Sequence, residues 1–176
     1  PVVEAVASIL LADSGRTARD RRAERLFRLD RLDPPTGVVG SGRLAAADDA
    51  DLLGEWIAAF AAEAHASARD PAELVARLLE PPGGAWLWTG EGGTPVALAA
   101  RRPVAYGSAR IGPVYTPPAH RGRGYGSAVT ARATRAILDE GAIPVLFTDL
   151  ANPVSNSIYQ RIGYRPVRDQ ARIMFD

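Results

Sequence analysis

The residue types best suited to chemistry gather in the stretch HRGRGYGSAVT, residues 120–130. Three glycines alternate there, Gly122, Gly124 and Gly126, directly before a segment whose apolar residues recur at helical spacing. A glycine-rich turn at a helix N-terminus leaves backbone N–H groups without acceptors, and the helix dipole adds to their attraction for an anion. The stretch therefore predicts a binding site for a phosphate group.

Two common nucleotide motifs do not fit this loop. A Walker A loop needs a lysine followed by Ser or Thr, and the sequence contains no lysine. A Rossmann fingerprint that begins at Gly122 needs its third glycine at position 127, which is Ser127. An enzyme that uses ATP or NAD is therefore disfavoured.

A second group of polar residues lies downstream, in NPVSNSIYQRIGYRPV, residues 152–167. On a helix Asn152, Ser155 and Tyr159 are spaced i, i+3 and i+7, which places them on one stripe. Several other positions of this helix are apolar, so the stripe predicts a polar partner.

Together the two stretches resemble the GNAT superfamily of N-acetyltransferases. RGRGYG, residues 121–126, is similar to the family's pyrophosphate loop, Arg/Gln-x-x-Gly-x-Gly/Ala, and the second stretch to its closing segment, Asn-x-x-Ala/Ser-x-x-x-Tyr followed by Gly-Tyr/Phe. The resemblance covers roughly residues 40–176. It implies an α/β (α+β) fold with a mixed, mostly antiparallel sheet flanked by helices, whose fourth and fifth strands splay apart around acetyl-CoA.

The resemblance also assigns the contacts with the cofactor. In the family, the backbone of the fourth strand pairs with the pantetheine amides, and the loop amides hold the pyrophosphate. The implied cofactor-binding residues are Val114, Tyr115, Thr116, Arg121, Gly122, Arg123, Gly124, Tyr125, Gly126, Ser127, Asn152 and Ser155.

For catalysis, Tyr159 stands where the family keeps its general acid, and the alternative is an aromatic residue that only packs. Many family members carry a glutamate base on the fourth strand, and RIGPVYT has none. Glu63 and Asp149 are the candidates for the base, ahead of His65 and His120.

The implied function is an acetyl-CoA-dependent N-acetyltransferase in which a small-molecule or peptide amine attacks directly in a ternary complex. The alternative is a noncatalytic acyl-CoA-binding module that senses or regulates. With no cysteine and only two histidines, we expect no metal centre.

The patterning also predicts the order of elements. Residues 1–40 are interpreted as an N-terminal extension, with a helix to about Leu11 and an edge strand in RLFRLDRL, which a linker joins to a GNAT domain over residues 41–176. This extension is interpreted as a remnant of a preceding domain. Within 41–176 we expect two helices, the first opening at Asp48 or Asp49 and the second capped by Asp70, then three strands (85–89, 95–102, 108–116), a helix ended by Gly141, a strand buried on both faces (144–150), a helix ended by Gly163 and a strand (171–175).

Composition sets the remaining expectations. The formal net charge is +1 at pH 7, which gives no reason to expect a nucleic-acid partner. No apolar run reaches the roughly 18 residues of a membrane span, and no signal peptide is recognisable. We expect a cytoplasmic, bacterial protein without a membrane partner, and a homodimer remains open.

Overall fold

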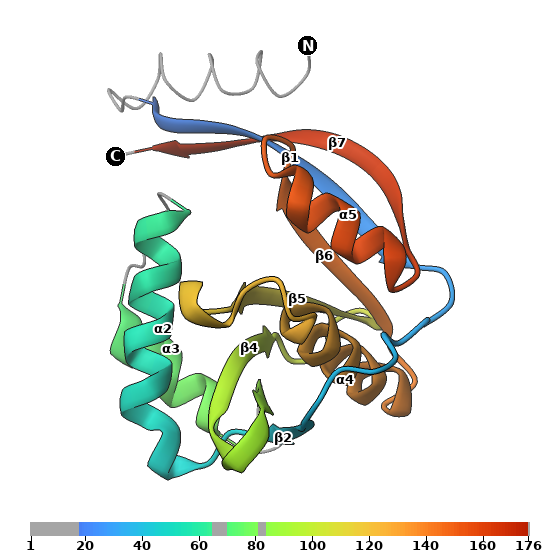
Figure 1. Ribbon diagram of the computed structural model, residues 1–176. Helices are drawn as coiled ribbons and strands as arrows, with labels where there is room; N and C mark the ends of the chain where they lie inside the picture. Colours follow the sequence, from blue (N-terminus) through green and yellow to red (C-terminus); the bar gives the residue numbers. More distant parts are fainter. Residues whose placement is uncertain (1–17, 65–69, 81–83, 176) are drawn as a thin grey trace.

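One seven-stranded sheet organises the part of the chain that the structure, a computed structural model, describes, namely residues 18–64, 70–80 and 84–175 (Figure 1). Its strands follow the order β2-β3-β4-β5-β6-β1-β7. Within the described residues every neighbouring pair is antiparallel except β5 and β6. The elements are β1 (Ala18–Leu29), β2 (Ser41–Leu44), α2 (Ala50–Glu63), α3 (Pro71–Leu79), β3 (Ala85–Thr89), β4 (Pro95–Arg101), β5 (Ser108–Tyr115), α4 (Tyr125–Asp139), β6 (Ile143–Asp149), α5 (Pro153–Arg161) and β7 (Tyr164–Phe175). The predicted mixed, mostly antiparallel fold flanked by helices is confirmed.

Helices cover the two faces of the sheet in pairs. Leu53, Trp56 and Ile57 of α2 are buried with residues of α3 and of β3, β4 and β5 in one apolar cluster. Val129 and Ile137 of α4 are buried in the other cluster, together with residues of α5, β1, β6 and β7. Because side chains alternate along a strand, the same sheet supplies both clusters.

The N-terminal strand is the main departure from the predicted organisation. The sequence predicts an edge strand there, which is wrong: β1 lies inside the sheet, paired with β6 on one side and with β7 on the other. Residues before and after Gly40 therefore share one sheet. The derivation of residues 1–40 from a preceding domain stays a prediction, and the helix expected up to Leu11 lies outside the described residues.

Two local expectations have different outcomes. Asp70 caps α3 as predicted, since its carboxylate accepts hydrogen bonds from the backbone N–H groups of Ala72 and Glu73 at 3.0 and 3.1 Å. The strand at 143–149 is not buried on both faces. Its residues alternate between buried and less buried, with Phe147 half-buried on the side opposite α4.

Within the described ranges, no helix is both long and apolar enough to cross a bilayer. The same ranges contain no group of three or more His, Cys, Asp or Glu side chains placed to hold a metal ion.

The central position of β1 makes a testable prediction about stability. Phe27 of β1 is fully buried and packs against the ring of Tyr159, with 6.4 Å between the ring centroids. We expect Phe27→Ala to lower the free energy of unfolding by about 3 to 5 kcal/mol in urea denaturation, the usual cost of emptying such a site. The neighbouring Arg28→Ala, at an exposed position, is the control and should change it little. An unchanged free energy of unfolding in the Phe27 variant would mean that β1 does not contribute to the stability of the fold.

Candidate functional site

A gap opens between the only two parallel strands in the described part of the sheet. β5 pairs with β6 only from Ser108 to Ile111. Beyond this point β5 continues beside β4, with Tyr115 opposite Leu98, while β6 continues beside β1. The register of β4 and β5 shifts in the same region, and a bulge of this kind bends a strand. The splay predicted between these two strands is confirmed.

The glycine-rich loop lies between β5 and α4 and presents a row of free backbone donors. Among the described residues, no acceptor is found for the N–H groups of residues 122 to 127. Gly122 and Gly124 have φ values of 78° and 81°, so the loop alternates between left-handed and ordinary backbone, the geometry of an anion-binding nest. These donors are followed directly by the N-terminus of α4, which begins at Tyr125. The loop can therefore hold an anion with backbone groups alone.

Two of these glycines also lie in close packing. A Cβ atom added at Gly126 would lie 3.3 Å from Oγ1 of Thr116. One added at Gly124 would lie 3.0 Å from Cγ2 of Val38. Gly122 is different, because a Cβ atom there would have no neighbour within 4 Å.

Glu63, a candidate base, and Arg121, a candidate cofactor ligand, form an ion pair with each other. Nη2 of Arg121 donates to both carboxylate oxygens of Glu63, at 2.9 and 2.6 Å, and its Nε donates to the carbonyl of Thr116 at 2.8 Å. The hydroxyl of Tyr115 donates to Oε1 of Glu63 at 3.1 Å. Burial raises the pKa of Tyr115, and the hydrogen bond to Glu63 adds to this increase. Both oxygens of Glu63 therefore already accept hydrogen bonds, which compete with its use as a base.

Tyr159 lies in the apolar core rather than on an open surface. The residue is 9% exposed, and its ring packs on Phe27 and on Tyr164, with a centroid distance of 6.3 Å to the latter. Burial raises the pKa of its hydroxyl to about 12. The apolar cluster that contains Tyr159 also includes Tyr125 at the start of α4, with Val114 of β5 packed against it.

One residue of the polar stripe, Asn152, helps to build α5. Oδ1 of Asn152 accepts the backbone N–H of Ser155 at 3.0 Å, which caps the helix. Asn156, which the sequence did not single out, accepts a hydrogen bond from Thr148 at 2.7 Å and donates to the carbonyl groups of Asp149 and Asn152. Asn156 therefore joins the end of β6 to α5 through hydrogen bonds. The sequence pattern does not indicate this role, because Asn156 lies one position away from the stripe.

Asp149, the second candidate base, ends β6 at the edge of the gap. Its Oδ1 accepts the backbone N–H of Ala151 at 2.8 Å, so part of the carboxylate stabilises the turn into α5. Its partner across the strand pair is Glu24 of β1. His120 forms part of the short turn before the glycine loop, and His65 lies outside the described residues.

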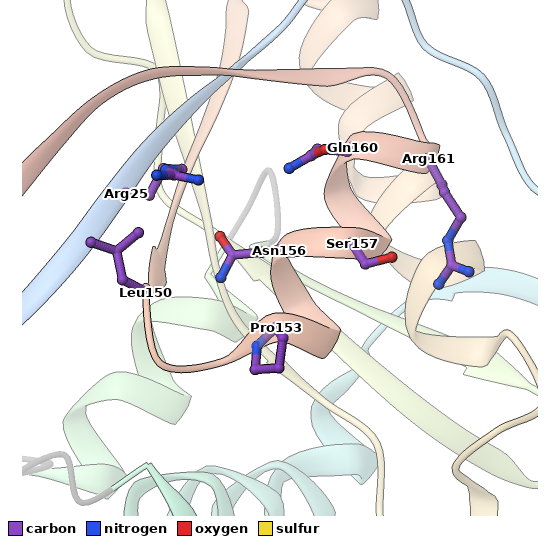
Figure 2. A pocket seen from close by; sticks show the side chains of 7 residues that line it. All are labelled: Arg25, Leu150, Pro153, Asn156, Ser157, Gln160 and Arg161. Atoms are coloured by element: carbon purple, nitrogen blue, oxygen red, sulfur yellow. The ribbon is translucent and has the colours of Figure 1, made fainter.

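A separate hollow of about 500 Å³ lies beside α5 (Figure 2). Leu150 and Pro153 form part of its lining, and Asn156 and Gln160 point toward Arg25, whereas Arg161 points away from it. Arg25 is already paired with Asp169 through two hydrogen bonds, of 2.6 and 2.9 Å. None of the predicted site residues lines this hollow, and its charged groups do not converge on a common point.

Comparison with known proteins supports the fold and the family. A family model described as FR47-like protein matches residues 91–173. A GNAT-family protein from Novosphingobium aromaticivorans has a TM-score of 0.71 at 18% identity, over 92% of this chain and 67% of its own. An acetyltransferase from the GNAT family of Colwellia psychrerythraea has a TM-score of 0.71 at 13% identity, over 97% of this chain and 62% of its own. A GCN5-related N-acetyltransferase from Kribbella flavida has a TM-score of 0.63 at 27% identity, over 96% of this chain and 62% of its own.

The fold is thus that of GNAT acetyltransferases, although the chain spans only about two thirds of the length of these solved chains. The FR47-like match and the shared fold support the GNAT superfamily for this chain. No curated protein sequence matches it.

The environment of Tyr159 makes a prediction about pH. Folding raises the pKa of the Tyr159 hydroxyl from 10.0 to about 12, so the folded chain holds this proton more tightly than the unfolded chain. The free energy of unfolding should therefore fall as the pH rises from about 10 toward 12. Tyr159→Phe should flatten part of this fall in urea denaturation at increasing pH, and the fully exposed Tyr106→Phe should not. An identical alkaline fall in both variants would contradict the burial of this hydroxyl.

Proposed function

We propose that the protein is an acetyl-CoA-dependent N-acetyltransferase that acts on an amine. The observation that carries this proposal is the row of N–H groups from Gly122 to Ser127, which have no acceptor among the residues that the structure describes, in the loop that follows β5. A pyrophosphate is the anion that such a loop fits, and the acetyltransferases among the similar structures support the same class.

Acetyl-CoA fits the residues on both sides of the loop. The free backbone edge of β5 beyond Ile111, at Val114 to Thr116, is proposed to pair with the pantetheine amides as an added strand would. Ser155 is retained as a contact through its hydroxyl, and Asn152 through the nitrogen of its amide, because its oxygen caps α5. Arg121 is proposed to act mainly by fixing the loop, since Glu63 and Thr116 hold its guanidinium.

When bound, acetyl-CoA supplies an acetyl group activated as a thioester. Tyr159 is proposed to donate a hydrogen bond to the departing sulfur. With a pKa of about 12 its hydroxyl stays protonated at neutral pH, so it always carries the proton that this bond needs. Full transfer of this proton to a thiolate whose thiol has a pKa of about 8.5 is uphill. The hydrogen bond from Tyr159 to the departing sulfur is therefore the larger effect.

An attacking amine must lose a proton, for which Asp149 and Glu63 are the proposed acceptors. Asp149 requires the smaller change, because only one of its oxygens has a partner among the described residues. Both oxygens of Glu63 already accept hydrogen bonds, from Arg121 and Tyr115.

The loop assignment predicts the behaviour of two matched glycine variants. Gly122 and Gly141 have φ values of 78° and 72°, and neither has a neighbour within 4 Å of an added Cβ atom. Each alanine substitution strains the backbone by a similar amount, but only Gly122 lies among the free donors. We expect Gly122→Ala to weaken coenzyme A binding about tenfold or more in calorimetry, a loss of about 1.4 kcal/mol, and Gly141→Ala to leave it unchanged. Equal affinities in the two variants would remove the loop from the binding site.

Tyr159→Phe tests the chemistry separately from binding. The phenyl ring keeps the packing with Phe27, so coenzyme A affinity and folding should be retained while kcat falls about 10²-fold or more, the usual contribution of a positioned acid. Thiol release from acetyl-CoA in a panel of amines measures this. Acetyl-CoA binding without turnover of any amine by the unmodified protein would favour a noncatalytic sensor, and an unchanged kcat in the variant would reassign Tyr159 to packing.

A further inference from the structure

The sheet has one face that the helices of the described residues leave partly open. On β6, Val145 and Phe147 point away from α4, and their partners on β1 are Arg28 and Leu26. α2 and α3 lie on this side, but the described residues of their apolar cluster come from β3, β4 and β5 and none from β6, β1 or β7. We call the side of β6, β1 and β7 that faces away from α4 the open sheet face.

Arginines lie around a shielded carboxylate on this face. Glu24 of β1 has a side chain only 12% exposed, and its Oε1 lies 3.5 Å from Nη1 of Arg172 on β7. Arg110 reaches from β5 across the ring of Phe147, with its guanidinium carbon 4.8 Å from the ring centroid. Burial lowers the pKa of Arg110, the charge of Glu24 opposes this change, and the charges of Arg172 and Arg102 add to it.

The charge at this cluster is therefore unbalanced. The charges of Arg172 and Arg102 both act on the guanidinium of Arg110, and among these partners only Glu24 carries a negative charge. Asp149, opposite Glu24 on β6, uses one oxygen in its own turn. A cluster with excess positive charge over a half-buried aromatic floor favours a planar anion that Arg can bind through two hydrogen bonds.

The cluster also lies beside the proposed reaction site. Arg110 stands one residue before the end of the pairing between β5 and β6, and Phe147 flanks the gap on β6. On the same side, Nη1 of Arg22 on β1 donates to the carbonyl of Ala64 at the end of α2, so β1 and α2 are joined there. In Figure 1 this end of α2 approaches the ends of β1 and β7. The glycine loop leads directly into α4, which packs on the other face of the sheet.

We propose that the open sheet face binds the acceptor through a carboxylate, with Arg110 and Arg172 as its partners, so that the acceptor is an amine that also carries a carboxylate. This inference rests on the proposed acetyltransferase function. Glu24 holds Arg172 in place, and the ring of Phe147 holds Arg110. The coenzyme enters from the side of α4 and the acceptor from the side of α2, so neither blocks the other.

Matched acceptors and matched variants test the proposal. Thiol release is measured with pairs of amines that differ only in a carboxylate, such as glycine against glycinamide and glutamate against glutamine. The unmodified protein should prefer the acid of a pair. Arg110→Gln and Arg172→Gln should each raise KM for the acid about tenfold or more, with kcat and the KM for acetyl-CoA unchanged. Arg165→Gln is the control, because Arg165 also lies on β7 and pairs at 3.7 Å with an acid, Asp30, which directly follows β1 at the far end of the strand pair.

Calorimetry with the same pairs and coenzyme A separates failure of this inference from failure of the proposed function. Turnover of amides as well as acids, or an unchanged KM in both variants, would overturn the carboxylate site and leave the acetyltransferase intact. Absence of any turnover would overturn the proposed acetyltransferase function. The binding measurements alone would then test the carboxylate site. Tighter binding of the acid, lost in Arg110→Gln and kept in Arg165→Gln, supports the carboxylate site, and equal binding of acid and amide overturns it.

Discussion

The pairing between β5 and β6 ends at Ile111, and the proposed chemistry depends on this interruption. A parallel pair that continued to the ends of both strands would satisfy their backbone groups and leave no room between them. Here β5 turns toward β4 at a bulge, while β6 stays beside β1. The free edge of β5 and the loop that follows it are left with unused hydrogen-bonding groups at one place.

The two sides of this gap have different chemistry. On the side of α4 the available groups are the backbone N–H donors from Gly122 onward, which suit the phosphate group of a larger ligand. On the side of α2 they are side chains, with the Glu63–Arg121 pair at the end of β5 and the arginines around Glu24 further along the sheet. Tyr159 belongs to neither set, since it is buried between α5 and the strands. This division matches a reaction in which a coenzyme and an acceptor approach from opposite sides.

Most of the local structure could be predicted from the sequence, because local rules decide it. The alternating glycines specify the left-handed backbone at Gly122 and Gly124, and Asp70 followed by Pro71 specifies the start of a helix. The place of β1 could not be predicted, since pairing partners far along the chain are not encoded in a strand's own pattern. The partners of Glu63 were missed for a similar reason, because Arg121 is 58 residues away in the sequence.

The most direct test of the central claim is an NMR titration of the backbone amides with coenzyme A and, separately, with pantetheine, which lacks the pyrophosphate. The account predicts that the amide signals of residues 122 to 127 shift strongly with coenzyme A and little with pantetheine, while the signals of Val114 to Thr116 respond to both. Equal responses of the loop to the two compounds, or shifts confined to other parts of the chain, would contradict it.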